Sequence, residues 1–240
     1  MTVSEAAGGR RELRKAQTRA EIRAVAQHLF AERGFDGVTS ADVAAAAGVA
    51  VQTVFNHFGS KEDLFFDGRT PWVEGLAAAV ENREPGTDPL TALRHYLIAD
   101  IEALLEQESR PDNRSYIEVL ASSPTLQARE RSLVEIASSR LAEALLAAIP
   151  AGSYAAASQQ ADPVKAELLS QLGASLFLVA GRVLVLGHRQ VVLDPAADEA
   201  SRRTVVAVTT AALATLEDCL RTLARQEFGR PADADRAPDA

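Results

Sequence analysis

Apolar residues recur along this chain at the spacing of amphipathic helices, and no segment alternates apolar and polar positions long enough to predict a strand. In residues 17–33, for example, Ile22, Ala26 and Leu29 fall on one helical face. Gly34 follows that segment, at the position where a glycine commonly ends a helix. The pattern therefore predicts an all-α protein.

Cap-forming and turn-forming residues divide the rest of the chain into further helices. Thr39 and Ser60 are each followed three residues later by an aspartate, a pattern that begins a helix. The first predicts a helix that ends near Ala47, and the second predicts a long helix toward Val80. A turn-rich break follows at residues 81–89. The later helices are expected at about 89–108, 114–122, 125–148, 163–188 and 198–227.

Two short helices in the N-terminal part are separated by a turn that contains Gly48. The first ends near Ala47, and the second starts at about Val51 and has room for only about two turns before the next glycine. Together with the preceding helix they predict a three-helix unit that contains a helix-turn-helix. Packing of that unit leaves four polar side chains outside on the second short helix: Gln52, Thr53, Asn56 and His57.

The composition is that of an ordinary globular chain. Its 240 residues are 47% hydrophobic and 24% charged, with a mean hydropathy of -0.04, which argues against both a disordered and a membrane-embedded protein. The net charge of -8 argues against nucleic-acid binding, but residues 1–61 carry eight basic and six acidic side chains, a net +2. Spacing therefore carries more weight here than overall charge.

The single cysteine, Cys219, excludes an internal disulfide and a cysteine-based metal site. The first ten residues lack the apolar stretch of a secretory signal. The most apolar segment, 172–187, is shorter than the roughly 18–20 residues that a membrane span needs, and it contains Arg182. We therefore expect a cytoplasmic protein without a membrane partner, in which both this segment and Cys219 are buried.

Patterns typical of enzymes are missing from the sequence. No histidine has a glutamate three residues before it, the arrangement that holds metal ions in helical bundles. A glycine-rich phosphate loop and a Gly-x-Ser-x-Gly nucleophile turn are also absent. We therefore expect no enzymatic activity, no cofactor and no bound metal.

Residues 18–64 hold four segments in a distinctive order. These are TRAEIRAVAQHLFAERGF at 18–35, VT at 38–39, DVAAAAGV at 42–49 and TVFNHFGSKEDL at 53–64. Over about 47 consecutive residues the chain resembles the tetracycline-repressor (TetR) family of bacterial transcriptional regulators. Beyond them it resembles the family only in length and helical pattern. The resemblance implies an N-terminal DNA-binding domain followed by a helical ligand-binding and dimerisation domain.

The resemblance also implies an organisation and a function. The expected parts are a flexible basic arm at 1–16, a DNA-binding domain at 17–64, a ligand-binding and dimerisation domain at 65–228 and a disordered tail at 229–240. The implied function is a repressor that a small-molecule effector of unknown identity releases from a palindromic double-stranded DNA operator. Alternatives are a ligand-independent or global regulator or an activator of the same fold, and more remotely a helical small-molecule-binding protein without a DNA function.

Carried over by position, the resemblance assigns roles to residues of the DNA-binding domain. Base edges are faced by Val51, Gln52 and Asn56, and this suits their chemistry, because amides pair with adenine and Val51 can touch a thymine methyl. Phosphates are faced by Thr39, Thr53, His57 and Lys61. The arm attracts phosphates through Arg10, Arg11, Arg14, Lys15 and Arg19.

Two positions depart from the family's pattern. Ala50 stands where a serine is usual, and Phe55 stands where a tyrosine is usual. Both replacements remove a hydroxyl that would contact the DNA backbone or cap the helix. We therefore expect fewer phosphate hydrogen bonds and a loss of about 1 kcal/mol at the helix end.

Large or polar side chains of the second domain mark a candidate effector pocket, although a core aromatic or a surface polar group is the more common role for each of them. They are Trp72, His95, Tyr96, Tyr116, Phe177 and Arg182. Among its apolar neighbours Arg182 needs a negatively charged partner, either an effector carboxylate or an acidic side chain.

The last two helices are too apolar to face water, and the resemblance implies that they pair across a two-fold axis in a homodimer. The expected interface residues are Leu172, Leu176, Val179, Val183, Val205, Val208, Ala212 and Leu216.

Overall fold

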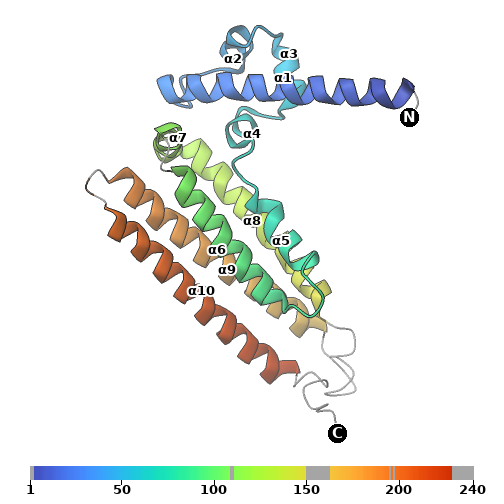
Figure 1. Ribbon diagram of the computed structural model, residues 1–240, viewed down its shortest axis with the longest axis vertical. Helices are drawn as coiled ribbons and strands as arrows, with labels where there is room; N and C mark the ends of the chain where they lie inside the picture. Colours follow the sequence, from blue (N-terminus) through green and yellow to red (C-terminus); the bar gives the residue numbers. More distant parts are fainter. Residues whose placement is uncertain (1–2, 109–110, 150–162, 195, 197, 229–240) are drawn as a thin grey trace. The chain divides into compact units, whose positions relative to one another are not determined.

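The structure is a computed structural model that describes residues 3–108, 111–149, 163–194, 196 and 198–228. In these residues the chain forms ten α-helices and no strand, which confirms the all-α prediction (Figure 1). The helices are α1 (Val3–Arg33), α2 (Ser40–Ala46), α3 (Val51–His57), α4 (Lys61–Phe66), α5 (Trp72–Glu81), α6 (Pro89–Glu108), α7 (Pro111–Ser122), α8 (Pro124–Ala148), α9 (Pro163–Leu193) and α10 (Glu199–Phe228). The predicted tail at 229–240 lies outside the described residues.

The chain divides into two compact units. Unit 1 consists of Met1–Thr70 with Pro111–Glu130, and unit 2 of Pro71–Arg110 with Arg131–Ala240. Unit 1 extends beyond the expected domain boundary at residue 64 and also takes in α7. The ring of Tyr116 on α7 stacks on that of Phe65 on α4, with 4.6 Å between ring centroids. Through this contact α7, which follows α6 in the sequence, packs as part of unit 1.

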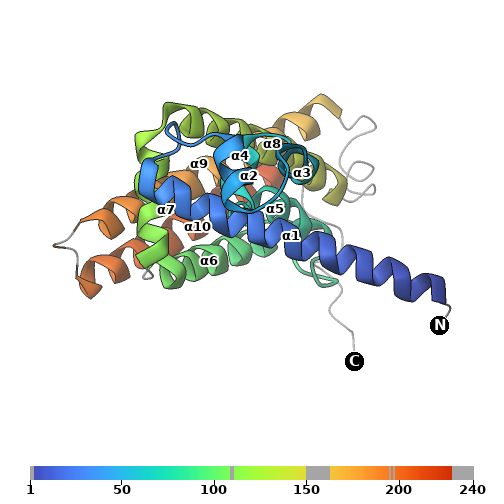
Figure 2. The same ribbon diagram turned by 90° about the horizontal axis from the view of Figure 1, so that it is seen from above.

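Unit 1 is built around an aromatic cluster against α1. The ring of Phe30 lies 5.3 Å from that of Phe35 and 5.8 Å from that of Phe65. Ile22 and Ala26, on the same side of α1, are fully buried. The helices α2, α3 and α4 gather along the C-terminal half of α1 (Figure 2). The buried face predicted for this helix is therefore confirmed.

The predicted start of the first helix at about residue 17 is wrong, because α1 already begins at Val3 and residues 3–16 are helical, while the flexibility of this arm stays a prediction. These residues are mostly alanine, arginine, lysine, glutamate and leucine, which favour a helix even without packing. The N-terminal turns of α1 project beyond the other helices of unit 1 (Figure 2). Arg11, Arg14 and Lys15 on these turns are exposed, and the Arg10 side chain lies outside the described residues.

The long helix predicted from Ser60 toward Val80 is also wrong, since it is divided into α4 and α5. Ser60 does cap α4, where its hydroxyl accepts a hydrogen bond from the Asp63 amide at 3.0 Å. The interruption follows from Gly68, whose φ of +71° is open to glycine at little cost, and from Pro71, the residue before α5.

The core of unit 2 is shared among α5, α6, α8, α9 and α10. Each helix contributes fully buried side chains, represented by Leu76, Leu93, Leu141, Phe177 and Leu213 in that order. The helix α10 packs against both α9 and α6, and α5 packs against α6 (Figure 1). Unit 2 is thus a bundle of long helices with a continuous apolar interior.

The helix α9 departs from the expectation of a short, buried helix. Among the described helices it alone is long and apolar enough to cross a membrane by length and composition, over Pro163–Val191, and 33% of its most apolar stretch is buried. Ala174 and Phe177 face the core, whereas Val179 and Val183 are 58% and 61% exposed. One face of α9 therefore belongs to the core of unit 2 and the other face is open.

A buried carboxylate joins α10 to the start of α6. Glu217, whose side chain is 5% exposed, accepts a hydrogen bond from the Thr91 hydroxyl at 2.6 Å and one from Arg94 Nε. Arg221 Nη2 lies 2.5 Å from Glu217 Oε1 and 3.3 Å from Asp88 Oδ1. Burial acts to raise the pKa of Glu217, but the hydrogen bonds and the two arginine charges outweigh it and hold the pKa below its usual value.

We predict that the substitution Glu217→Gln lowers the free energy of unfolding at pH 7 by on the order of 2 kcal/mol, because it removes the buried anion that Arg94 and Arg221 share. The pKa of Glu217 is lower in the folded chain than in the unfolded chain. Its contribution to stability is therefore present above the unfolded-state pKa and lost as the pH falls through the folded-state pKa. Thermal unfolding of both proteins at pH 7 and pH 3, followed by circular dichroism, tests this expectation.

The matched control for Glu217→Gln is Glu74→Gln. Glu74 lies 2.7 Å from Arg140 in an ion pair of the same unit, with both side chains more than half exposed. Such a pair contributes about 0–1 kcal/mol, so its loss is expected to change stability little. Equal effects of the two substitutions, or a difference from wild type that persists unchanged at pH 3, would contradict the role given to Glu217.

Candidate nucleic-acid interface

The turn between α2 and α3 has the geometry of a helix-turn-helix. Gly48 has a φ of +66°, a conformation that side chains other than glycine rarely adopt. The amide of Val49 donates a hydrogen bond to the Ala44 carbonyl at 3.0 Å, which closes the end of α2. The chain can therefore turn within three residues and begin α3 at Val51, as the sequence predicts.

The N-terminus of α2 is fixed by the capping box expected at Thr39. The Thr39 hydroxyl accepts a hydrogen bond from the Asp42 amide at 3.2 Å, and Asp42 Oδ2 accepts one from the Thr39 amide at 2.8 Å. Hydrogen bonds from the Thr39 hydroxyl and amide lower the pKa of Asp42. The phosphate contact predicted for Thr39 stays a prediction, and in the free chain its hydroxyl serves the cap.

The helix α3 has a buried side and an exposed side. Val54 on α3 and Phe58 directly after it are each 2% exposed and hold the helix to the core of unit 1. The exposed side chains are Val51, Gln52, Phe55 and Asn56. All three residues predicted to face base edges are thus brought together on the open side of α3.

Three of the four predicted phosphate contacts occupy less open positions than the base-facing residues. Thr53 and His57 are half-buried on α3, and Thr39 lies at the exposed start of α2. The ammonium group of Lys61 donates hydrogen bonds to the carbonyls of Phe35 and Val38 at 3.0 and 2.9 Å. It also lies 4.0 Å from the centroid of the Phe35 ring. Lys61 therefore has a structural role that its sequence position did not reveal, and its phosphate contact stays a prediction.

Arg19, predicted as part of the basic arm, makes contacts within the domain, and its attraction of phosphates stays a prediction. Its guanidinium donates a hydrogen bond to the carbonyl of His57, the last residue of α3, and lies 2.5 Å from Asp67 Oδ1 and 4.3 Å from the centroid of the Phe58 ring. Arg23, one helical turn later, lies 3.3 Å from Asp67 Oδ2. The sequence reasoning missed Asp67, and the signal for it was a pair of arginines four residues apart on one face of α1.

The two departures at α3 have the structural consequences that the sequence indicates. Ala50 is the N-cap residue of α3, and no side chain supplies a capping hydrogen bond there. Phe55 is 48% exposed, so its ring is turned toward solvent and not into the core. The surface of α3 is therefore more apolar, and its first turn less well capped, than the family's pattern implies.

The predicted effector-pocket residues do not form one group in the structure. Tyr116 belongs to unit 1, whereas Phe177 is fully buried in unit 2 and His95 is exposed. Trp72 and Tyr96 are half-buried against the core of unit 2. Arg182 is also half-buried, on α9. An effector role for these six residues stays a prediction.

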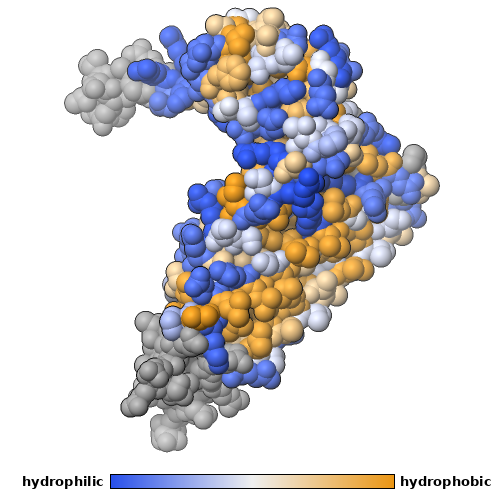
Figure 3. Space-filling model, turned by 180° about the vertical axis from the view of Figure 1, so that it is seen from behind, coloured by the Kyte–Doolittle hydropathy of each residue, from blue (hydrophilic) through white to orange (hydrophobic). Residues whose placement is uncertain are grey.

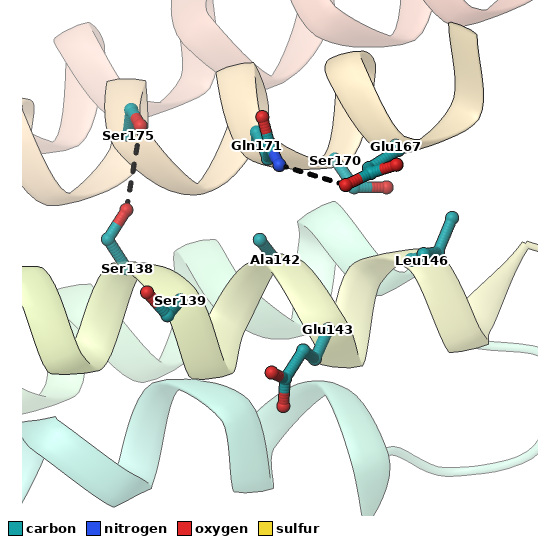
Figure 4. Close-up of a pocket in the computed structure, with 9 residues that line it drawn as sticks. All are labelled: Ser138, Ser139, Ala142, Glu143, Leu146, Glu167, Ser170, Gln171 and Ser175. Carbon is teal, nitrogen blue, oxygen red and sulfur yellow. Dashed lines mark hydrogen bonds between the residues drawn. The ribbon is translucent and has the colours of Figure 1, made fainter. Parts of the chain in front are cut away.

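A cavity of about 470 Å³ lies instead between α8 and α9 in unit 2 (Figure 4). Its lining residues are Ser138, Ser139, Ala142, Glu143, Leu146, Glu167, Ser170, Gln171 and Ser175. Ser138 and Ser175 point toward each other with 3.5 Å between their hydroxyl oxygens, and Gln171 donates a hydrogen bond to Glu167 at 3.3 Å (Figure 4). None of the six predicted residues is among the lining residues, which include four serines and three longer polar side chains and gave no signal in the sequence.

Tyr96, a predicted pocket residue, forms a half-buried pair on α6 with Asp100, which the sequence reasoning missed. The Tyr96 hydroxyl lies so close to α5 that a Cβ atom at Gly75 would come within 1.9 Å of it, so a side chain at this position would require the Tyr96 ring to move. Burial and the charge of Asp100 raise the pKa of Tyr96 to about 12, and burial raises the pKa of Asp100 itself. The pair gives unit 2 a polar patch next to its apolar core.

The predicted dimer residues lie largely on the open side of α9 and α10. Leu172, Leu176, Val179, Val183 and Val208 are between 37% and 61% exposed. Ala212 is also exposed, whereas Val205 and Leu216 are half-buried. Hydrophobic residues cover much of one face of the lower part of the molecule in Figure 3. The expectation that Cys219 is buried is wrong, since its position on α10 is exposed.

Comparison with known proteins gives matches of three kinds. The sequence model described as "Bacterial regulatory proteins, tetR family" matches residues 22–67. Among curated proteins, the HTH-type transcriptional regulator AcrR of Shigella flexneri is 33% identical over 97 residues, which are 39% of this chain and 45% of that protein. The HTH-type transcriptional repressor KstR2 of Mycobacterium tuberculosis is 31% identical over 87 residues, 36% of this chain and 44% of that protein.

Among solved structures, a TetR-family regulator from Streptomyces coelicolor is 23% identical to this chain, with a TM-score of 0.46. The match covers 83% of this chain and 96% of the solved chain. The matches cover less than half the length of both of these curated relatives. The matches to those relatives therefore concern part of the molecule.

We predict that Ala50→Ser stabilises the protein by about 1 kcal/mol, because a serine at the N-cap can accept a hydrogen bond from an amide of the first turn of α3. Urea unfolding followed by circular dichroism measures this change. Ala45→Ser, at an exposed position inside α2, is the matched control and is expected to be neutral or slightly destabilising. If the two variants behaved alike, the missing cap would not limit the stability of unit 1.

Proposed function

We propose that the chain is a sequence-specific DNA-binding transcriptional repressor, because residues 22–67 match the sequence model of the tetR family of bacterial regulatory proteins. It acts in the cytoplasm as a homodimer and leaves its operator when a small molecule binds to unit 2. The remaining alternative is a regulator or activator of the same fold that responds to no ligand.

The observation that carries the proposal is the exposed side of α3. A seven-residue helix that follows a tight turn presents Gln52 and Asn56 to solvent while Val54 fixes it to the core behind. An α-helix fits the major groove of DNA, where glutamine and asparagine amides can hydrogen-bond to base edges. The exposed Arg11, Arg14 and Lys15 on α1 add positive charge that attracts phosphates.

The open face of α9 and α10 supports the homodimer. Exposed branched apolar side chains repeat along α9 at helical spacing, among them Leu172, Val179 and Val183. An apolar face of this kind on a soluble protein indicates an interface. A second copy is the simplest partner, because a two-fold axis pairs the same face on both chains and presents two α3 helices to a palindromic operator.

The cavity between α8 and α9 supports an effector site in unit 2. Its volume of about 470 Å³ lies in the range that suits small molecules. Binding that favours one arrangement of the dimer would change the separation of the two α3 helices, which must be about one DNA turn, roughly 34–36 Å. Such a change lowers the affinity for the operator and releases it.

Selection of bound fragments from sheared genomic DNA of the source organism tests the proposal, at about 150 mM salt, where non-specific phosphate attraction is weakened. We expect recovery of a pseudo-palindrome with half-sites one helical turn apart. Asn56→Ala is expected to bind that sequence about tenfold or more weakly, because a lost base contact costs on the order of 1–3 kcal/mol.

The control for this experiment is Asn82→Ala, which removes an exposed amide from the end of α5 in unit 2. It is expected to bind the recovered sequence as the wild type does. Recovery of random fragments only, or equal binding by the Asn56→Ala variant and the wild type, would show that α3 does not read DNA.

A second prediction concerns the dimer. The double substitution Val179→Glu with Val183→Glu places two charges on the open face of α9, where both side chains are more than half exposed in the single chain. We expect the molar mass measured by light scattering to fall from two chains to one, because pairing would bury both charges.

Leu13→Glu is the matched control for the double substitution, because Leu13 is 71% exposed on α1, in the other unit. This variant is expected to remain dimeric. A dimer that persists with both glutamates in α9 would place the interface elsewhere.

A further inference from the structure

The open side of α3 carries two parallel ridges. Val51 and Phe55 are four residues apart and form an apolar ridge, and Gln52 and Asn56, also four apart, form a polar ridge beside it. Val51 is 40% exposed and Phe55 is 48% exposed. Each ridge is therefore continuous over one turn of the helix and open to a partner.

The apolar ridge is not needed to hold α3 in place. Val54 and Phe58, each 2% exposed, supply the contacts of α3 and its end with the core of unit 1. Arg19 hydrogen-bonds to the carbonyl at the C-terminal end of the helix. A phenylalanine half open to water on a helix that is already anchored indicates contact with something outside the chain.

The major groove offers one apolar group on the base edges, the C5-methyl of thymine. A ridge of one β-branched and one aromatic side chain matches such methyl groups and offers nothing to hydrogen-bond donors or acceptors. We propose that Val51 and Phe55 contact thymine methyl groups and thereby select thymines at fixed positions of each half-site. This inference rests on the proposed function and deepens it by naming the bases that are read.

The neighbouring polar ridge fits the same base pairs. Gln52 Nε2 donates a hydrogen bond to Asn56 Oδ1 at 3.1 Å. The pair keeps the Gln52 carbonyl oxygen as an acceptor and the Asn56 amide hydrogens as donors. Adenine presents the complementary N6 donor and N7 acceptor in the major groove, and its partner is thymine. Both ridges of α3 thus favour half-sites that contain A·T pairs.

The test uses the full-length protein and the duplex recovered from genomic DNA, with each thymine of the half-site replaced in turn by deoxyuridine. This replacement removes only the methyl group. We expect affinity to fall about fourfold at each thymine that the ridge contacts, the effect of uncovering one methyl group. In the Phe55→Ala and Val51→Ala variants this sensitivity to uracil is lost at the thymine that each side chain contacts.

Two further variants separate apolar contact from a general loss of binding. Phe55→Leu keeps an apolar side chain and is expected to keep the sensitivity to uracil. Ile136→Ala removes a side chain that is 41% exposed on α8, far in sequence from α3, and is expected to behave as the wild type. Far-UV circular dichroism of each variant confirms that the helical content is unchanged.

The outcomes distinguish this inference from the proposed function. The recovered duplex can bind tightly with an affinity that no uracil replacement changes, or it can lack a thymine common to both half-sites. Either result overturns the proposed contact with methyl groups and leaves DNA binding intact. Sensitivity to uracil that persists in Phe55→Ala and Val51→Ala overturns the assignment to these residues. Failure to recover any preferred sequence overturns both the inference and the proposed function.

Discussion

A seven-residue helix is not stable by itself in water, and everything proposed for this protein depends on how α3 is held. Its support comes from outside the helix. Val54 and Phe58 insert into the core of unit 1, Gly48 allows the tight turn before it, and the Arg19 guanidinium bonds to the carbonyl at its end. Because these contacts all lie behind α3 or at its ends, the front of the helix remains available to a ligand.

The helices could largely be predicted from the sequence because their signals are local. Gly34, Thr39 and Ser60 mark ends and starts that the structure confirms, since caps and positive φ angles depend on a few neighbouring residues. The extension of α1 to Val3 and the break between α4 and α5 at Gly68 were not predicted. The apolar pattern is weak in both regions. Intrinsic helix propensity decides the extension of α1, and a single glycine decides the break between α4 and α5.

The candidate site was predictable only where sequence position alone fixes which side of a helix is open. The exposure of Gln52 and Asn56 follows from the buried positions on α3, but the use of Lys61 by two backbone carbonyls and the pairing of Arg19 with Asp67 depend on segments distant in sequence. The cavity between α8 and α9 is lined by serines and alanine together with a leucine and three longer polar side chains, a mixture without any pattern that sequence reasoning can detect.

The hydrogen bond between Gln52 and Asn56 bears on the entropy of recognition. A free glutamine side chain samples many rotamers in water, and fixing it against a base costs up to about 2 kcal/mol of conformational entropy. In α3 part of that ordering takes place when the chain folds, within the helix, before any DNA is present. A short helix with only two amide readers can then discriminate between bases with a smaller entropic penalty than two independent side chains would incur.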